Sequence, residues 1–219
     1  LQDVICCKLV GYNLVQEIGN ATDKLRTEHV PLHGGAIYSE IDSHLEGYSS
    51  TFSGFVASAR GGFIFSDADS TCILEDVLVT ECVADYGGAF YTSVGGNFNM
   101  TAVQIRNCTA HSAGGGFFFD GSISASLNSL LVQDCTADSG GGMFVDDSTR
   151  IDLSGNCSMI QNSAKVGGAV YVDQQGVLLG CAGCYMHGNM ASAMGGAVYM
   201  SGRHYPYHCQ GRRSLLETT

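Results

Sequence analysis

Carboxylate side chains recur along this chain at a nearly constant interval. Asp120, Asp146 and Asp173 follow one another in almost equal steps, and Asp147 adds a neighbouring carboxylate. Calcium takes carboxylate and carbonyl oxygens as ligands, so a calcium ion could offset the mutual repulsion of these groups if the interval brings them side by side. Alternatively, Asp serves here as a turn residue that caps backbone amides. Both interpretations stay open, and calcium is the one cofactor that the sequence suggests.

Ten cysteines offer a second kind of chemistry, because several of them follow the same interval. Cys82, Cys108 and Cys135 form such a series, which Asn162 and Asn189 continue. A stack of thiols could form disulfides or bind a soft metal ion. However, three thiols cannot all pair with one another, and stacked β-carbons lie farther apart than the ~3.8 Å of a relaxed disulfide. We therefore predict small, buried, free thiols at these three positions.

Two further cysteine pairs, Cys181 with Cys184 and Cys157 with Cys184, could bind a metal ion or form a disulfide. Cys181 and Cys184 have the spacing of zinc and redox motifs, but no second CxxC pair accompanies them. Cys157 and Cys184 are separated by the same interval as the members of the cysteine series. They are the pair that we expect to be bonded if one disulfide joins successive repeats.

The sequence carries no nucleophile motif. Its seven histidines do not follow the interval, and no GxSxG phrase occurs. These features predict a protein that is not an enzyme, and no catalytic residue is assigned.

The interval comes from an internal repeat, which seven Gly-Gly pairs mark. The pairs begin at positions 34, 61, 87, 114, 140, 167 and 195, so each repeat is about 27 residues long. A mostly small residue, an apolar residue and an aromatic residue follow each pair. Adjacent glycines suit a tight corner, and the β-branched and aromatic residues favour a strand.

Two further strands fit into each repeat. Apolar residues lie three and five positions before each Cys or Asn of the series, as in Ile105 and Val103, and share one face at period two. Another apolar residue, such as Met100, lies eight positions before, with Ser154 as an exception. This odd spacing predicts a corner or bulge between the two strands. Three short strands in about 27 residues predict a right-handed parallel β-helix of about seven coils.

The aromatic residues form a column of their own in such a helix. Stacking the repeats aligns Tyr38, Phe65, Tyr91, Phe118, Phe144, Tyr171 and Tyr199. The column could be an exposed platform for sugar rings. Because three of its members are Phe, we favour a buried position, which would require a bend at the corner.

The repeat phrases carry a family resemblance over roughly residues 50 to 200. The phrase Gly-Gly-Ala-apolar-aromatic, preceded by apolar-x-x-Asn or apolar-x-x-Cys, resembles the polymorphic outer membrane protein repeat of chlamydial autotransporter adhesins. The resemblance implies a surface-exposed β-helix used in adhesion, with no reaction. The cysteines and glycosylation sequons favour a eukaryotic relative, such as an algal or protist surface protein.

Charge and sequons indicate the compartment and the partners. The net charge of -11 gives no basic face for nucleic acid. No apolar run approaches the ~20 residues of a membrane-spanning helix. Sequons favour secretion to the exterior or the cell surface, and their acceptors are Asn20, Asn99, Asn107 and Asn156.

We therefore expect three parts: an N-terminal cap or irregular first coil at residues 1–33, the β-helix at 34–202, and a C-terminal cap or tail at 203–219. The predicted function is an extracellular structural or adhesive scaffold that forms part of a larger surface protein. Its expected partners are glycans, surface proteins and further coils of the same polypeptide. The alternative is a carbohydrate-active β-helix enzyme of the polysaccharide lyase or polygalacturonase type.

Overall fold

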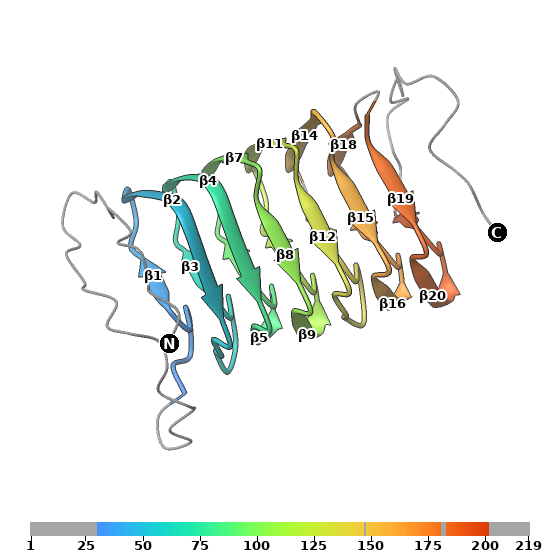
Figure 1. Cartoon of the computed structure of the whole chain (residues 1–219), viewed down its shortest axis with the longest axis horizontal. Coiled ribbons are helices and arrows are strands. Elements are labelled where there is room, and N and C mark those ends of the chain that lie inside the picture. The colour runs from blue at the N-terminus through green and yellow to red at the C-terminus, as the bar shows by residue number, and fades with distance from the viewer. Residues whose placement is uncertain (1–29, 147, 181–182, 202–219) are drawn as a thin grey trace.

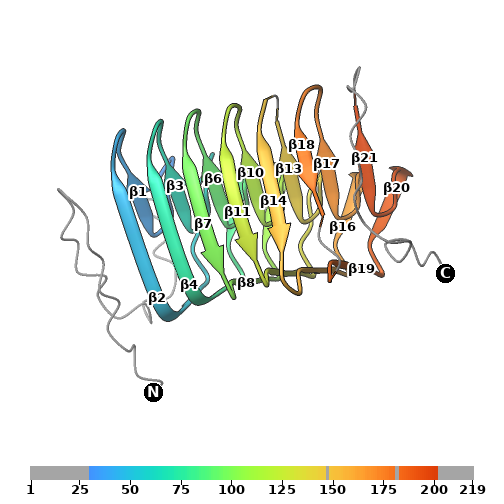
Figure 2. The same ribbon diagram turned by 90° about the horizontal axis from the view of Figure 1, so that it is seen from above.

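The computed structural model describes residues 30–146, 148–180 and 183–201, and this part of the chain contains strands and no helix. The coils lie side by side along the long axis of the molecule (Figure 1), and one sheet consists of the seven strands that follow the Gly-Gly pairs (Figure 2). These are β1 (Ile37–Ser39), β3 (Ile64–Ser66), β6 (Phe90–Thr92), β10 (Phe117–Phe119), β13 (Met143–Val145), β17 (Val170–Val172) and β21 (Val198–Met200). Every neighbouring pair is parallel, and the aromatic residues at their centres are in register from Tyr38 to Tyr199.

A ten-stranded sheet forms two further sides of each coil (Figure 2). Its strands are β2 (His44–Ser53), β4 (Thr71–Thr80), β7 (Asn97–Thr101), β8 (Gln104–Arg106), β11 (Ser124–Asn128), β12 (Leu131–Gln133), β14 (Arg150–Ser154), β15 (Ser158–Ile160), β18 (Val177–Leu179) and β19 (Tyr185–His187). The first two strands are ten residues long. In the next three coils the same stretch is divided by a residue with positive φ: Ala102, Ser129 or Gly155.

Two short parallel pairs complete the coil ahead of the Gly-Gly corner: β5 (Val83–Tyr86) with β9 (Thr109–Ala113), and β16 (Ser163–Val166) with β20 (Met190–Met194). Isolated parallel bridges connect them through Thr136 and Ser139. Equivalent strands of successive repeats, about 27 residues apart in the sequence, thus stack along one axis. The predicted parallel β-helix is confirmed, with about six turns.

Side chains that point inward from these sheets form one continuous core. Met100, Val103 and Ile105 are fully buried in it, and Ala102, with a φ of 54°, makes the predicted corner between the two strands. One expectation was misplaced. Leu153, rather than Ser154, pairs with Leu127 and fills the core position. The extra residue of this coil is accommodated at the Gly155 corner, where φ is 66°.

The Gly-Gly corner explains why both of its positions are glycine. The first glycine has a positive φ, for example 68° at Gly114, where an L residue with a side chain would be strained. The second packs against the next coil, because a Cβ on Gly115 would lie 2.1 Å from the carbonyl oxygen of Gly141. Backbones therefore approach one another here more closely than any side chain allows.

Residues 30–33 already belong to the first coil. Ser58 N donates to Pro31 O at 2.8 Å, and His33 forms a parallel bridge with Arg60. Residues 1–29 of the predicted N-terminal cap and the whole predicted C-terminal cap, residues 203–219, lie outside the described residues. No helix in the described ranges has the length and apolar character needed to cross a membrane.

Candidate functional surfaces

The aromatic column forms a continuous ring stack on the outer side of the seven-stranded sheet. Its neighbours Phe117 and Phe119 enter the main core, while Phe118 joins a separate cluster with Phe65 and Tyr91. Ring centroids along the stack are 4.7 to 5.4 Å apart. The expected interior position, reached by a bend at the corner, is therefore wrong. Phe65, Tyr91 and Phe118 are buried outside the main core by ring stacking, whereas the other four rings are half-buried or exposed.

This stacking decides what the column can bind. Phe65, Tyr91 and Phe118 are only 4%, 3% and 8% exposed, and the planes of Tyr91 and Phe118 lie 6° from parallel. A sugar ring would need a free aromatic face, and both faces of each of these rings are covered by the adjacent rings. The centre of the column is therefore a structural element, while Tyr38 at its N-terminal end is 39% exposed.

Polar side chains flank the ring stack on both sides. Arg60 places its guanidinium 5.0 Å from the centroid of the Tyr91 ring, and His33 stacks on Phe65 at 4.8 Å. On the other side, the Tyr91 hydroxyl donates to a carboxylate oxygen of Asp120. Burial and this hydrogen bond raise the pKa of Tyr91, and the nearby Arg60 charge opposes part of the increase.

The sequence did not identify Arg60 and His33 as partners of the aromatic column. Both lie one position before a Gly-Gly pair, and Tyr86 at the equivalent position packs edge-on against Phe118. The position before each Gly-Gly pair could therefore have been found from the repeat. That its side chain contacts the rings could not, because this depends on how the chain turns at the corner.

Asp67, Asp120, Asp146 and Asp173 occupy the same position in their repeats and form the carboxylate column. Three of them accept hydrogen bonds from hydroxyl groups of adjacent coils. Tyr38 donates to Asp67 at 3.1 Å, Tyr91 to Asp120, and Ser201 to Asp173. The described residues contain no group of three or more His, Cys, Asp or Glu side chains arranged to hold a metal ion. Asp147, a member of the predicted calcium set, lies outside them. The calcium site stays a prediction, which a melting curve in calcium and in chelator can test.

The Cys82, Cys108 and Cys135 thiols are free and fully buried. Each donates to the carbonyl oxygen two residues before it at 3.4 Å. The pKa of Cys82 is raised by its hydrogen bond with Cys108 and by burial, and a hydrogen bond with Cys135 raises that of Cys108. The three thiols thus fill buried corner positions and bond to the backbone, which fits the predicted structural role.

Asn162 and Asn189 extend the same column as an amide ladder. Asn162 Oδ1 accepts from Cys135 N at 3.0 Å, and its Nδ2 donates to Val132 O and to Asn189 Oδ1, both at 3.0 Å. Asn189 Nδ2 in turn donates to Met159 O at 2.8 Å. The amide satisfies the backbone groups of a corner buried between coils.

The predicted disulfide between Cys157 and Cys184 is wrong. Cys157 is a free, buried thiol that donates to Ser154 O at 3.0 Å and to Leu127 O at 3.3 Å. Cys184 is disulfide-bonded. Its partner lies outside the described residues, because the other five described cysteines are free. Residues in register on successive coils point the same way, which does not bring two sulfur atoms together.

Three of the four sequon asparagines are on the surface. Asn99 is exposed on β7, and Asn107 and Asn156 are exposed at corners that flank β8 and β15. Asn20 lies outside the described residues. An oligosaccharide could reach each of the three exposed side chains without disturbing the core.

The outer side of β7 and β11 presents amides and hydroxyls without a large side chain. Its residues are exposed and in register: Asn97 with Ser124, Asn99 with Ser126, and Thr101 with Asn128. We call these six residues the amide and hydroxyl face. The side formed by β5, β9 and β16 differs, because it carries two exposed contacts between coils: a hydrogen bond between His111 and Asp85 at 2.9 Å, and an ion pair between Lys165 and Asp138 at 2.7 Å.

Comparisons with protein families, with curated proteins and with solved structures find no match. The function must therefore be argued from these surfaces alone.

Proposed function

We propose that this protein is an extracellular, non-catalytic β-helical scaffold whose lateral surfaces bind glycans or surface proteins. The amide and hydroxyl face supports this proposal most directly. Its six exposed side chains repeat at the spacing of parallel strands, about 4.8 Å. Amides and hydroxyls both donate and accept hydrogen bonds, as sugar hydroxyls do.

The charge of the chain narrows the class of glycan. A net charge of -11 repels polyanions such as uronans, so neutral polysaccharides and basic protein surfaces are the favoured partners. The same charge disfavours the alternative of a polysaccharide lyase or polygalacturonase, whose substrates are uronans. Incubation with polygalacturonate, with and without calcium, should release no unsaturated ends and no new reducing ends.

Binding can be tested by co-sedimentation of the full chain with insoluble cellulose and chitin. Asn99 is also a sequon residue, so the test uses Asn99→Gln, which keeps an amide but cannot carry an oligosaccharide. In that background we expect Ser126→Lys to weaken retention at least tenfold, because the lysine interrupts the amide and hydroxyl face. Thr136→Lys, an exposed substitution on another side of the coil, is the matched control and should bind as before.

Two results would overturn glycan binding by this face: no retention on either polysaccharide, or equal losses in both lysine variants. The extracellular part of the proposal has its own measurement. Protein from a secretory eukaryotic host should lose mass on treatment with an endoglycosidase. An unchanged mass would count against passage through the secretory route.

A further inference from the structure

One glycosylation sequon lies in the middle of the amide and hydroxyl face. Asn99 and Thr101, its first and third residues, are both exposed on β7 and point to the same side of the strand. Met100 between them points the other way and is fully buried in the core. An oligosaccharide on Asn99 would therefore leave from the centre of this face without disturbing the packing beneath it.

Every other member of the face lies within about 8 Å of Asn99. Its register partner Ser126 on β11 is one strand away, ~4.8 Å, and residues two positions along a strand are roughly 7 Å apart. The diagonal neighbours Ser124 and Asn128 are the farthest members. An oligosaccharide of several sugar residues extends beyond this distance, so one attached at Asn99 can cover the whole face.

The side chains that suit a free glycan would also bind the attached one. The amides and hydroxyls of the face can both donate to and accept from sugar hydroxyls. Ser124 and Ser126 are short, so they leave room for a sugar ring above β11. A covalent bond keeps the attached sugars at high effective concentration over the face, which puts a glycan from solution at a disadvantage.

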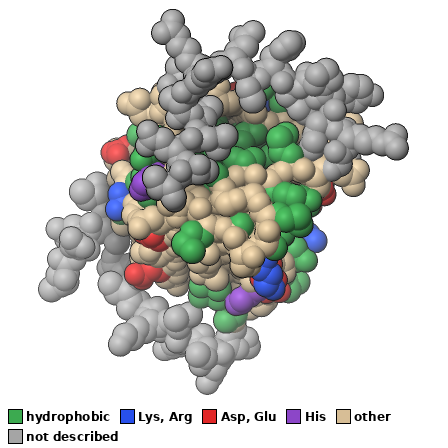
Figure 3. Space-filling model, turned by 90° about the vertical axis from the view of Figure 1, so that its right-hand side faces the viewer, with side chains coloured by type: hydrophobic (Ala, Val, Ile, Leu, Met, Phe, Trp, Pro, Cys, Tyr) green, Lys and Arg blue, Asp and Glu red, His purple; other side chains and the backbone are tan. Residues whose placement is uncertain are grey.

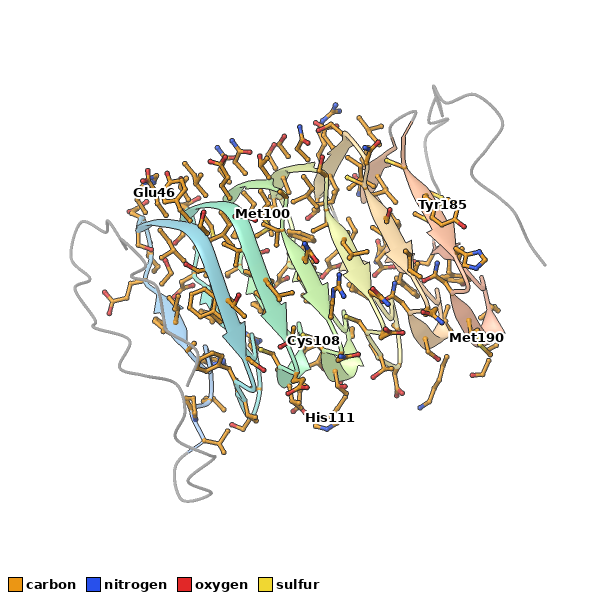
Figure 4. All side chains as sticks on the ribbon, in the orientation of Figure 1. Glu46, Met100, Cys108, His111, Tyr185 and Met190 are labelled. Atoms are coloured by element: carbon orange, nitrogen blue, oxygen red, sulfur yellow. The ribbon has the colours of Figure 1, made fainter. Side chains whose placement is uncertain are left out.

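The sequon at Asn107 provides a contrast within the same coil. Asn107 follows β8, which the corner at Ala102 separates from β7. Figure 4 places Met100 in the upper part of the view and Cys108, the middle residue of the Asn107 sequon, in the lower part. Figure 3 looks along the stack of coils, so different sides of a coil form different parts of its outline. A sugar on Asn107 would thus leave the amide and hydroxyl face open.

We infer that Asn99 is N-glycosylated and that its oligosaccharide closes the amide and hydroxyl face, so that only the unmodified chain binds a free glycan there. This regulation rests on the proposed glycan binding by the same face. In the reaction, the side-chain amide nitrogen of Asn99 forms a bond to the anomeric carbon of a lipid-linked oligosaccharide diphosphate. The bond from that carbon to the diphosphate oxygen breaks, the diphosphate leaves with the electron pair, and the amide loses one proton to a base.

Co-sedimentation with insoluble cellulose and chitin, using the full chain from a secretory eukaryotic host, tests this inference. Mass spectrometry of the peptide that contains residue 99 should show the oligosaccharide in the unaltered sequence. We expect this protein to be retained about tenfold or more weakly than Asn99→Gln, which keeps an amide but carries no sugar. Asn107→Gln removes a sequon on another side of the coil. It is the matched control and should be retained as weakly as the unaltered protein.

Thr101→Ala removes the same sequon in a second way, because it leaves Asn99 in place. It too should be retained more strongly than the unaltered protein, although the face has lost one hydroxyl group. A gain in both of these variants, but not in Asn107→Gln, would establish closure of the face by the Asn99 oligosaccharide.

Three results would overturn the inference while glycan binding by the face still stands. They are an unmodified Asn99, equal retention of Asn99→Gln and a protein whose Asn99 carries the sugar, and an equal gain in Asn107→Gln. Absence of retention in Asn99→Gln on both polysaccharides is a different result. It would contradict glycan binding by the open face, and the inference would fall with the proposed function.

Discussion

The folded structure raises the pKa of three buried thiols, those of Cys72, Cys82 and Cys108. Burial raises the pKa of Cys72 from 9.0 to about 12, and the pKa values of Cys82 and Cys108 are raised by hydrogen bonds within the thiol column and by burial. The repeat predicted that Cys82 and Cys108 would be small, buried and free. It did not predict their link through successive thiols, because sulfur positions depend on side-chain torsions that spacing does not fix.

The raised pKa of Cys72 predicts a loss of stability at alkaline pH. Below pH 9.0 the thiol is protonated in both the folded and the unfolded chain, so its contribution is fully present. Between pH 9.0 and about 12 the unfolded chain loses this proton and the folded chain keeps it. The free energy of unfolding should therefore fall by about 1.4 kcal/mol per pH unit from this group.

Urea unfolding in the presence of reductant, repeated at several pH values in this window, measures the slope. Cys72→Ala removes the group and should flatten the pH dependence by that amount, while other ionisable groups act equally in both proteins. Parallel pH profiles for the two proteins would contradict the assigned burial.

Corners, more than strands, decide how this chain folds. Each Gly-Gly corner could be located from spacing, because two adjacent glycines are a distinct signal. Other left-handed corners are occupied by ordinary residues, such as Glu81 at 59° and Gln161 at 56°, which carry no such signal. The misplaced Ser154 has the same cause, since its coil contains an extra residue at a corner that the spacing could not locate.

The ring stack shows a second limit of sequence reasoning. Alternation along β10 required Phe117 and Phe118 to point to opposite sides, and the repeat identified both columns. Composition then favoured placing the aromatic residues inside the helix. The alternative of burial on the outer side needs rings to cover one another between coils, and this depends on register and on flanking groups such as Arg60.

Replacing the second glycine of an internal pair should damage the β-helix. A Cβ on Gly115 would lie 2.1 Å from the carbonyl oxygen of Gly141, and both backbones are held by neighbouring coils. We expect Gly115→Ala to lower the free energy of unfolding by about 3 kcal/mol or more. Ser126→Ala, at an exposed position on β11, is the control and should change it by less than about 0.5 kcal/mol. Urea unfolding of both variants measures the contrast, and equal stabilities would refute the close approach at this corner.

The molecule as a whole is a one-dimensional stack, because each coil pairs with the coils directly before and after it. The seven-stranded sheet follows this order from β1 to β21 without exception. Stability in such an array is close to a sum of coil and interface contributions. Its lateral surface can therefore be changed at one coil without altering the coils farther along the stack.

Removal of one complete coil tests this description of the whole molecule. Deleting residues 114–139 joins Ala113 to Gly140, and Ala113 already forms a parallel bridge with Ser139, the residue that normally precedes Gly140. The new junction thus preserves the register of every column. We expect a soluble protein with the same β-type circular dichroism per residue and a lower melting temperature, because one coil and one interface are lost.

Deletion of residues 114–126 is the matched control. It removes about half a coil, so inward and outward columns can no longer align, and the protein should aggregate or lose its β signal. The control removes fewer residues than the full-coil deletion. A greater loss of structure in the control would therefore come from the lost register and not from the number of residues removed. If the full-coil deletion also collapsed, or if both deletions folded equally well, coils that contact only their neighbours could not account for the stability of the molecule.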